Sequence, residues 1–154
     1  MKTILIFTFS ILLSFSLSGQ TYRGSTRTQT LEEKLNDMYC TGLFNSTHGT
    51  IIDVASNNSI NGFLNVLNWL EGRVAGLRVY TSRSGIQYPT MRGSIPGIYL
   101  DEVPVSASTL NLINIHDIAI IKVIKTPFLG GANGAGGAIA IYTLGGEEEV
   151  EDGE

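Results

Sequence analysis

Two apolar segments in the last third of the chain are its clearest structural signal. Ile118–Ile124 (IAIIKVI) is apolar at almost every position, which is typical of a strand buried on both faces. Ala138–Thr143 (AIAIYT) places Ile139 and Ile141 on the same face of a second strand. The pattern therefore predicts two buried strands joined by the segment between them.

Helical periodicity is weaker and is confined to shorter segments. Residues 61–73 place four apolar side chains on one helical face: Phe63, Val66, Leu67 and Leu70. Residues 31–44 predict a short helix by a similar spacing, and a helical turn is expected within 109–115. Short strands are predicted at three further places: 50–54, 77–80 and 98–100. This mixed order predicts the α+β class, a small mixed sheet with flanking short helices.

The N-terminus has the layout of a secretory signal peptide. Lys2 precedes an apolar stretch over residues 4–17, and small residues follow before a cleavage site after Ser18 or after Gln20. The apolar stretch is short for a membrane span, which needs about 20 residues. We therefore expect export of the chain.

The last eight residues are strongly acidic. A charge run of this kind is typical of a solvated, disordered tail. The sequence thus divides into four expected parts: a signal peptide at 1–20, a flexible and partly helical segment at 21–49, an ordered domain at 50–146 and an acidic disordered tail at 147–154.

Charge and composition exclude several classes of function. The formal net charge of −4 provides no basic surface of the kind that binds nucleic acid. The single cysteine, Cys40, and the two histidines, His48 and His116, match no standard zinc spacing and suggest no catalytic thiol pair. We expect Cys40 to be a small apolar filler near a helix, and we expect no metal ion or other cofactor.

A glycine-rich segment, residues 129–138 (LGGANGAGGA), is the first candidate for chemistry. Glycine loops cradle phosphate when a lysine follows or when a helix follows the glycines. Here no lysine follows, and the next element is expected to be a strand. We therefore favour a tight turn between two buried strands, with glycines at positions of positive φ.

Few polar residues of the central part fit a catalytic arrangement. Asp101 and Glu102 are adjacent, and a polar hairpin turn explains them better than a paired acid and base, whose side chains an extended backbone would separate. Arg92 before Gly93 is either an ordinary surface arginine or a group that holds a carboxylate by a bidentate pair. The sequence leaves these two alternatives open.

Five blocks, in this order, resemble the plug domain of TonB-dependent outer-membrane receptors. Residues 70–79 (LEGRVAGLRV) are similar to the family's L-x-G-x-V-P-G-V-x-V, and 91–93 (MRG) to its I-R-G. Residues 98–105 (IYLDEVPV) resemble V-x-V-D-G-V-P-V, and 117–127 (DIAIIKVIKTP) resemble D-I-E-R-I-E-V-L-K-G-P. Residues 131–143 resemble the closing Y-G-x-x-A-x-G-G-V-I-x-I-x-T.

The resemblance implies a non-catalytic gate that fills a barrel of about 22 strands and whose outer loops help to bind substrate. It implies two partners, an outer-membrane β-barrel and a TonB-type coupling protein, with no nucleic acid and with membrane association only through a partner. It places the chain in the periplasm or at the outer membrane of a Gram-negative bacterium. It also makes eight motif positions candidates for binding: Arg92, Gly93, Asp101, Pro104, Gly131, Gly134, Gly136 and Gly137.

Other interpretations of the chain stay open at this point. The acidic end favours a stand-alone exported plug, which acts in the periplasm or docks on a separate barrel, over a fragment or remnant of a receptor. Two roles without transport are also open. One is a small periplasmic domain that binds ligand at the glycine segment, and the other is an interaction domain that adds the strand near 103–105 to a partner's sheet.

Overall fold

The structure is a computed structural model, and it describes residues 28–128 and 134–145. The expected signal peptide at 1–20, the expected acidic tail at 147–154 and Gly131 lie outside these ranges.

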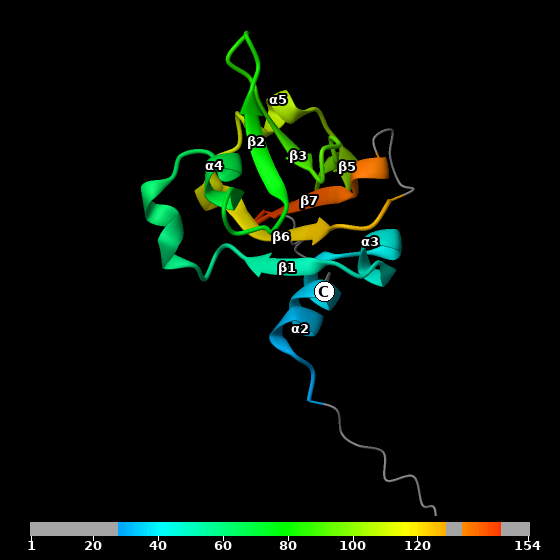
Figure 1. Cartoon of the computed structure of the whole chain (residues 1–154). Helices are drawn as coiled ribbons and strands as arrows, with labels where there is room; N and C mark the ends of the chain where they lie inside the picture. The colour runs from blue at the N-terminus through cyan, green and yellow to red at the C-terminus, as the bar shows by residue number, and fades with distance from the viewer. Residues whose placement is uncertain (1–27, 129–133, 146–154) are drawn as a thin grey trace, which may run out of the picture.

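A five-stranded mixed sheet organises the fold (Figure 1), which is of the expected α+β class. In the order of the sheet, its strands are β1 (Thr50–Asp53), β6 (Ile118–Ile124), β7 (Ala138–Thr143), β4 (Gly97–Leu100) and β5 (Val103–Pro104). The β4–β7 pair is parallel and the other pairs are antiparallel. The two apolar runs predicted as buried strands are β6 and β7, next to each other at the centre of this sheet.

The register of β6 and β7 separates their side chains into two cores. Ile121 pairs with Ile141 and Val123 with Ile139, so these four side chains lie on one face of the sheet. The alternate residues of the same strands, such as Ile124 and Ala140, belong to a second core on the opposite face. Both faces of the sheet are therefore covered.

The first face is covered by a layer from the middle of the chain. Its elements are η2 (Asn58–Gly62), α4 (Val66–Leu70), the two-stranded sheet of β2 (Leu77–Thr81) and β3 (Gln87–Met91), α5 (Ala107–Leu110) and η3 (Ile115–Asp117). Their buried side chains include Trp69, Leu70, Met91 and Leu110, none of which is exposed to solvent.

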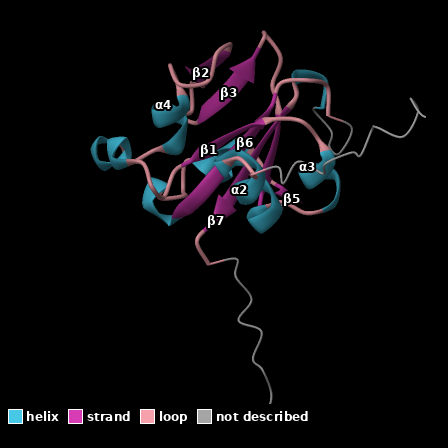
Figure 2. Cartoon of the chain, turned by 90° about the horizontal axis from the view of Figure 1, so that it is seen from below, coloured by secondary structure: helices cyan, strands magenta, loops and turns pink. Residues whose placement is uncertain are grey.

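The second face is covered by the N-terminal helices (Figure 2), which are α2 (Leu31–Tyr39) and α3 (Gly42–Ser46). Thr30 caps α2 through a reciprocal pair of hydrogen bonds with Glu33, which satisfies two backbone amides at the helix start. Cys40 ends α2 and is buried with Phe44 of α3 in the second core, so the expectation that Cys40 fills space near a helix is confirmed.

Three helical predictions are wrong in extent. The single helix expected over 31–44 is two helices, α2 and α3, because Cys40 and Thr41 between them have extended backbones. The helix expected over 61–73 spans only Val66–Leu70, because the Asn65 side chain accepts a hydrogen bond from the Leu67 amide at 2.7 Å and starts the helix there. The turn expected within 109–115 forms earlier, at Ala107–Leu110. In the described ranges, no helix is long and apolar enough to cross a membrane.

Candidate functional site

The structure places the described motif positions at the two ends of the parallel β4–β7 pair. At one end, the Gly97 amide donates to the Gly137 carbonyl at 2.9 Å, next to the turn that contains Arg92 and Gly93. At the other end, the Asp101 amide donates to the Ile141 carbonyl at 2.9 Å. Pro104 lies in β5, beyond the Asp101 turn, and Gly134 begins η4 (Gly134–Gly136). The positions therefore form two separate groups.

Arg92 and Gly93 form a tight turn after β3. Both have positive φ, at 54° and 83°, and the flanking Met91 and Ser94 bond to each other's backbone. This is the conformation of a two-residue turn in which both central residues are left-handed. The Arg92 side chain is exposed, and its guanidinium makes no ion pair with any residue of the described ranges. The described part of the fold therefore supplies no carboxylate that could form the bidentate pair with Arg92.

Only glycine fits at positions 136 and 137, because the backbones of Ile95 and Ile124 pass too close for a side chain. A Cβ atom on Gly137, which has φ +83°, would lie 2.1 Å from the Ile124 carbonyl oxygen, and one on Gly136 would lie 2.7 Å from that of Ile95. A strand follows these glycines, as expected. For residues 134–138, the part of the segment that the structure describes, this geometry supports a tight turn over a phosphate cradle.

Asp101 and Glu102 form the predicted polar hairpin turn between β4 and β5, with φ values of 47° and 66°. Each carboxylate binds a different part of the molecule. Asp101 accepts two hydrogen bonds from Thr143, from the amide at 2.9 Å and from the hydroxyl at 3.0 Å. Asp101 therefore ties the turn to the end of β7.

Glu102 reaches instead to the N-terminal helices. Its carboxylate accepts from the Thr41 amide at 2.6 Å and from the Thr41 hydroxyl at 2.5 Å. The Tyr142 hydroxyl also donates to Glu102, at 3.2 Å. Burial, with Cys40 and Glu102 nearby, raises the pKa of Tyr142, so this phenol stays a donor. Residues 61 positions apart in sequence are thus joined at one carboxylate.

Lys122 is the one buried charged side chain of the described ranges, with 2% of its surface exposed. Its ammonium donates to Asn36 Oδ1 in α2 and to the Phe44 carbonyl in α3, both at 2.5 Å. Burial lowers the pKa of Lys122, while Cys40 and Glu102 act in the opposite direction. Sequence reasoning missed this residue, although a lysine inside a run of buried apolar positions indicates that it must have polar partners.

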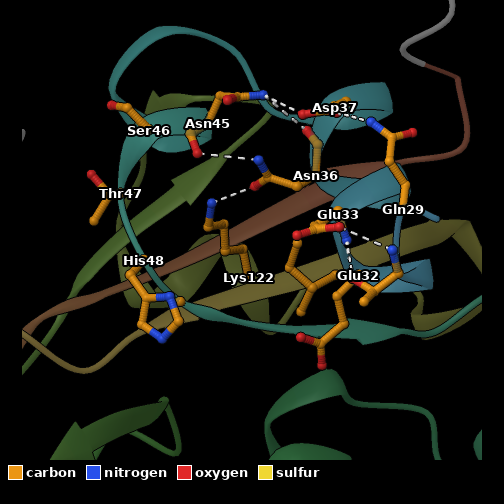
Figure 3. Close-up of a pocket in the computed structure, with 13 residues that line it drawn as sticks. Gln29, Glu32, Glu33, Asn36, Asp37, Asn45, Ser46, Thr47, His48 and Lys122 are labelled. Carbon is orange, nitrogen blue, oxygen red and sulfur yellow. Dashed lines mark hydrogen bonds between the residues drawn. The ribbon is translucent and has the colours of Figure 1, made fainter. Parts of the chain in front are cut away.

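A polar cleft of about 780 Å³ opens beside Lys122 (Figure 3). It lies between α2 and the segment that leads from α3 into β1, and its lining includes Glu32, Asp37, Asn45 and His48. No group of three or more His, Cys, Asp or Glu residues that could hold a metal ion occurs among the residues that the structure describes.

The β2–β3 hairpin is a second surface that sequence reasoning missed. Tyr80 and Tyr88 are paired across its strands, and their rings stack at 6.1 Å between centroids. Tyr80 is half exposed, and Arg78 lies on the same outward face. The tip of the hairpin projects from the body of the molecule (Figure 1). Between Gly72 and Leu100 the chain has four arginines and no acidic residue, so this region is basic.

Comparison with known proteins agrees with this architecture. A family model, the TonB-dependent receptor plug domain, matches residues 47–138. The RagAB peptide importer in its closed-closed state is 21% identical with a TM-score of 0.51, and the match covers 64% of this chain and 12% of that one. The siderophore receptor PirA from Acinetobacter baumannii is 18% identical with a TM-score of 0.53, over 75% of this chain and 19% of that one.

A variant of the ferric enterobactin receptor PfeA from Pseudomonas aeruginosa is 20% identical with a TM-score of 0.51, over 64% of this chain and 18% of that one. The chain thus spans between 12% and 19% of the length of these receptors, and at such identities the likeness shows the fold alone. No curated protein matches the chain. The family model, however, matches more than half of it, and the chain belongs to the family of TonB-dependent receptor plug domains.

Proposed function

We propose that this chain is a non-catalytic gate, an exported plug that occupies the lumen of an outer-membrane β-barrel and blocks passive diffusion through it. The family match over residues 47–138 carries the proposal, because a domain of this family is the plug of a receptor. The similar structures are named as a peptide importer, a siderophore receptor and a ferric enterobactin receptor. They support transport as the setting in which this domain acts.

In this proposal, the Arg92–Gly93 turn contacts the barrel wall. Arg92 is exposed at a rigid turn whose backbone is held by the Met91–Ser94 pair and by the Arg92 amide, which donates to the Gly76 carbonyl at 3.2 Å. An exposed guanidinium on a turn whose backbone is fixed in this way suits a bidentate pair with a carboxylate of a partner. Among the other motif positions, Gly137 fixes the fold near this turn, and Asp101 fixes the opposite end of the β4–β7 pair.

The projecting β2–β3 hairpin is the part that we assign to substrate contact. Its outward face combines the stacked Tyr80–Tyr88 pair with Arg78. An aromatic surface beside arginines binds ligands that have both an apolar or planar part and a negative charge. The proposal takes residues 1–20 as an export signal, which places the protein in the periplasm or at the periplasmic side of the outer membrane.

The test is capture of the tagged protein from solubilised outer membranes of the native host, with the captured proteins identified and quantified by mass spectrometry. We expect one β-barrel protein in stoichiometric amount, and a TonB-type protein in addition when coupling is intact. Arg92→Ala should lower recovery of the barrel about tenfold or more, since it removes one side of a desolvated charge pair. Lys34→Ala is the matched control, because Lys34 is an exposed cation on α2, outside the family match.

The opposite result is equally specific. Recovery of the protein without a barrel, from the soluble periplasmic fraction, would contradict the gate. Equal recovery of the barrel by the Arg92→Ala variant would contradict the assigned contact while leaving the gate intact.

A further inference from the structure

Residues 28–46, called the N-terminal segment below, lie outside the part of the chain that matches the family model. They contain α2 and α3, which cover the second face of the five-stranded sheet (Figure 2). We propose that the N-terminal segment is a detachable cover, which leaves this face as a unit while the sheet and the layer on its first face stay folded. The proposal concerns this chain's own conformations and does not depend on a barrel partner.

The N-terminal segment contributes few buried side chains of its own to the second core. No residue of α2 is buried, and Leu31 and Met38 are 64% and 55% exposed. Within the segment only Cys40 and Phe44 are buried, while Leu35 and Tyr39 pack against the second core and are half-buried. Segments with few buried apolar contacts open at a lower free energy than the core of the same domain, and they often open cooperatively.

Charged groups of the sheet hold the N-terminal segment at two places. Glu102 accepts from the amide and the hydroxyl of Thr41, which connects α2 to α3. Lys122 donates to Asn36 and to the Phe44 carbonyl. Charge-assisted hydrogen bonds are strong and directional, so they fix one closed position of the segment. Water can replace them when the segment leaves, which keeps opening reversible.

Glu102 has a backbone conformation that is unfavourable for glutamate. Its φ of 66° lies in the left-handed region, which glycine adopts without strain. Strain of this kind persists where the side chain has a specific use. The use visible in the structure is the pair of bonds to Thr41, 61 residues away, together with the bond from Tyr142.

Burial of Lys122 also raises the free energy of the closed state, in which the N-terminal segment covers the sheet. A buried ammonium loses its hydration, and only hydrogen bonds repay part of that cost. The polar cleft of Figure 3 lies beside Lys122, between α2 and the segment that enters β1, so water reaches the edge of this contact. Opening would hydrate Lys122 fully, which lowers the free energy needed to detach the N-terminal segment.

Two unique residues report on the two faces independently. Cys40 is the single cysteine of the chain and is 3% exposed beneath the N-terminal segment. Trp69 is the single tryptophan and is fully buried on the first face. The rate at which a maleimide labels Cys40 under native conditions therefore measures opening of the segment, and Trp69 fluorescence during urea unfolding measures stability of the rest.

The decisive variant is Glu102→Gly, made in the protein as purified. It removes the bonds to Thr41 and relieves the strained φ, so the two probes should move in different directions. We expect Cys40 labelling to accelerate about tenfold or more, while the urea midpoint reported by Trp69 stays unchanged or rises. Thr41→Val should accelerate labelling less, and should add little in the Glu102→Gly background, because both changes remove the same contact.

Asp101→Gly is the matched control. It changes the neighbouring residue of the same turn, also at positive φ, but Asp101 binds Thr143 of the sheet and not the N-terminal segment. Cys40 labelling should stay at the wild-type rate in this variant. The proposal is overturned if the labelling rate of Cys40 in every variant equals the rate calculated from global unfolding at Trp69, or if Glu102→Gly leaves the labelling rate unchanged.

Discussion

The two faces of the central sheet are built by different means. The first face packs Trp69, Leu110 and other wholly buried apolar side chains against β6 and β7. The second face holds a buried ammonium at Lys122, a thiol at Cys40 and the Tyr99 hydroxyl, which is buried without a hydrogen-bond partner among the described residues. The first core is thus formed by apolar side chains, while the second also contains polar groups that burial penalises.

The two layers therefore differ in how strongly their unfolding is coupled to unfolding of the sheet. Apolar side chains gain free energy only while they are buried, so the first layer and the sheet unfold together. Polar groups recover their hydration on exposure, which offsets part of the cost of uncovering the second face. Among the residues that the structure describes, burial shifts the pKa of four groups, and all four belong to the second face: Cys40, Tyr99, Lys122 and Tyr142.

The largest effect is expected from a change that both faces share. Gly137→Ala would place a methyl group 2.1 Å from the Ile124 carbonyl oxygen at a φ of +83°, so β6 and β7 would have to separate. We expect a loss of about 3–5 kcal/mol in the free energy of unfolding, or failure to fold. Urea unfolding followed by Trp69 fluorescence and by Cys40 labelling should report the same midpoint for the two faces.

Gly62→Ala is the control for this prediction. No atom lies within 4 Å of a Cβ at Gly62, so the free energy of unfolding should change by less than about 0.5 kcal/mol. A Gly137→Ala variant as stable as wild type would contradict the close approach on which the packing of both faces rests.

An intermediate effect separates the faces directly. Leu110→Ala truncates a fully buried side chain of the first face, and it should cost about 2–5 kcal/mol at both probes. Phe44→Ala removes a ring of the second face whose centroid lies 4.9 Å from the centroid of the Tyr99 ring. Because the N-terminal segment can detach, the free energy of unfolding reported by Trp69 should fall by less than about 2 kcal/mol, while Cys40 labelling accelerates. If both variants lost the same free energy of unfolding at Trp69, the layers on the two faces would be equally coupled to unfolding of the sheet.

Most strands of this fold, though not β3 (Gln87–Met91), were predictable from the sequence. The run at Ile118–Ile124 and the alternation at Ala138–Thr143 depend on local pattern, and burial on both faces followed from them. The Asp101–Glu102 turn was predictable for the same reason. The helix near Val66 was overextended, since periodicity does not reveal that the Asn65 side chain caps the helix from within the pattern.

The contacts of the candidate site were not predictable in the same way. A lysine at position 122 inside a buried strand indicates that polar partners exist, but nothing local names Asn36 or the Phe44 carbonyl. The bonds from Thr41 to Glu102 join residues 61 positions apart, and no periodicity connects such positions. Conversely, the motif positions Arg92 and Gly137 follow from the sequence, while the exposed turn at Arg92 and the close backbone contact at Gly137 depend on how distant strands pack.

The smallest effect is a pH dependence that belongs to the second face alone. Burial raises the pKa of the Cys40 thiol above its ordinary value of 9.0, so the folded protein keeps a proton that the unfolded chain loses. The free energy of unfolding should therefore be unaffected below pH 9 and should fall as the pH rises above it, by less than about 1.4 kcal/mol per pH unit. Cys40→Ala removes the contribution of the thiol and retains three others. The lowered pKa of Lys122 acts with the opposite sign below 10.5, and the raised pKa values of Tyr99 and Tyr142 act with the same sign as Cys40 near and above pH 10. Urea unfolding of both proteins at pH 8, 9 and 10 measures the difference, and parallel curves would show that Cys40 ionises as easily in the folded protein as in the unfolded chain.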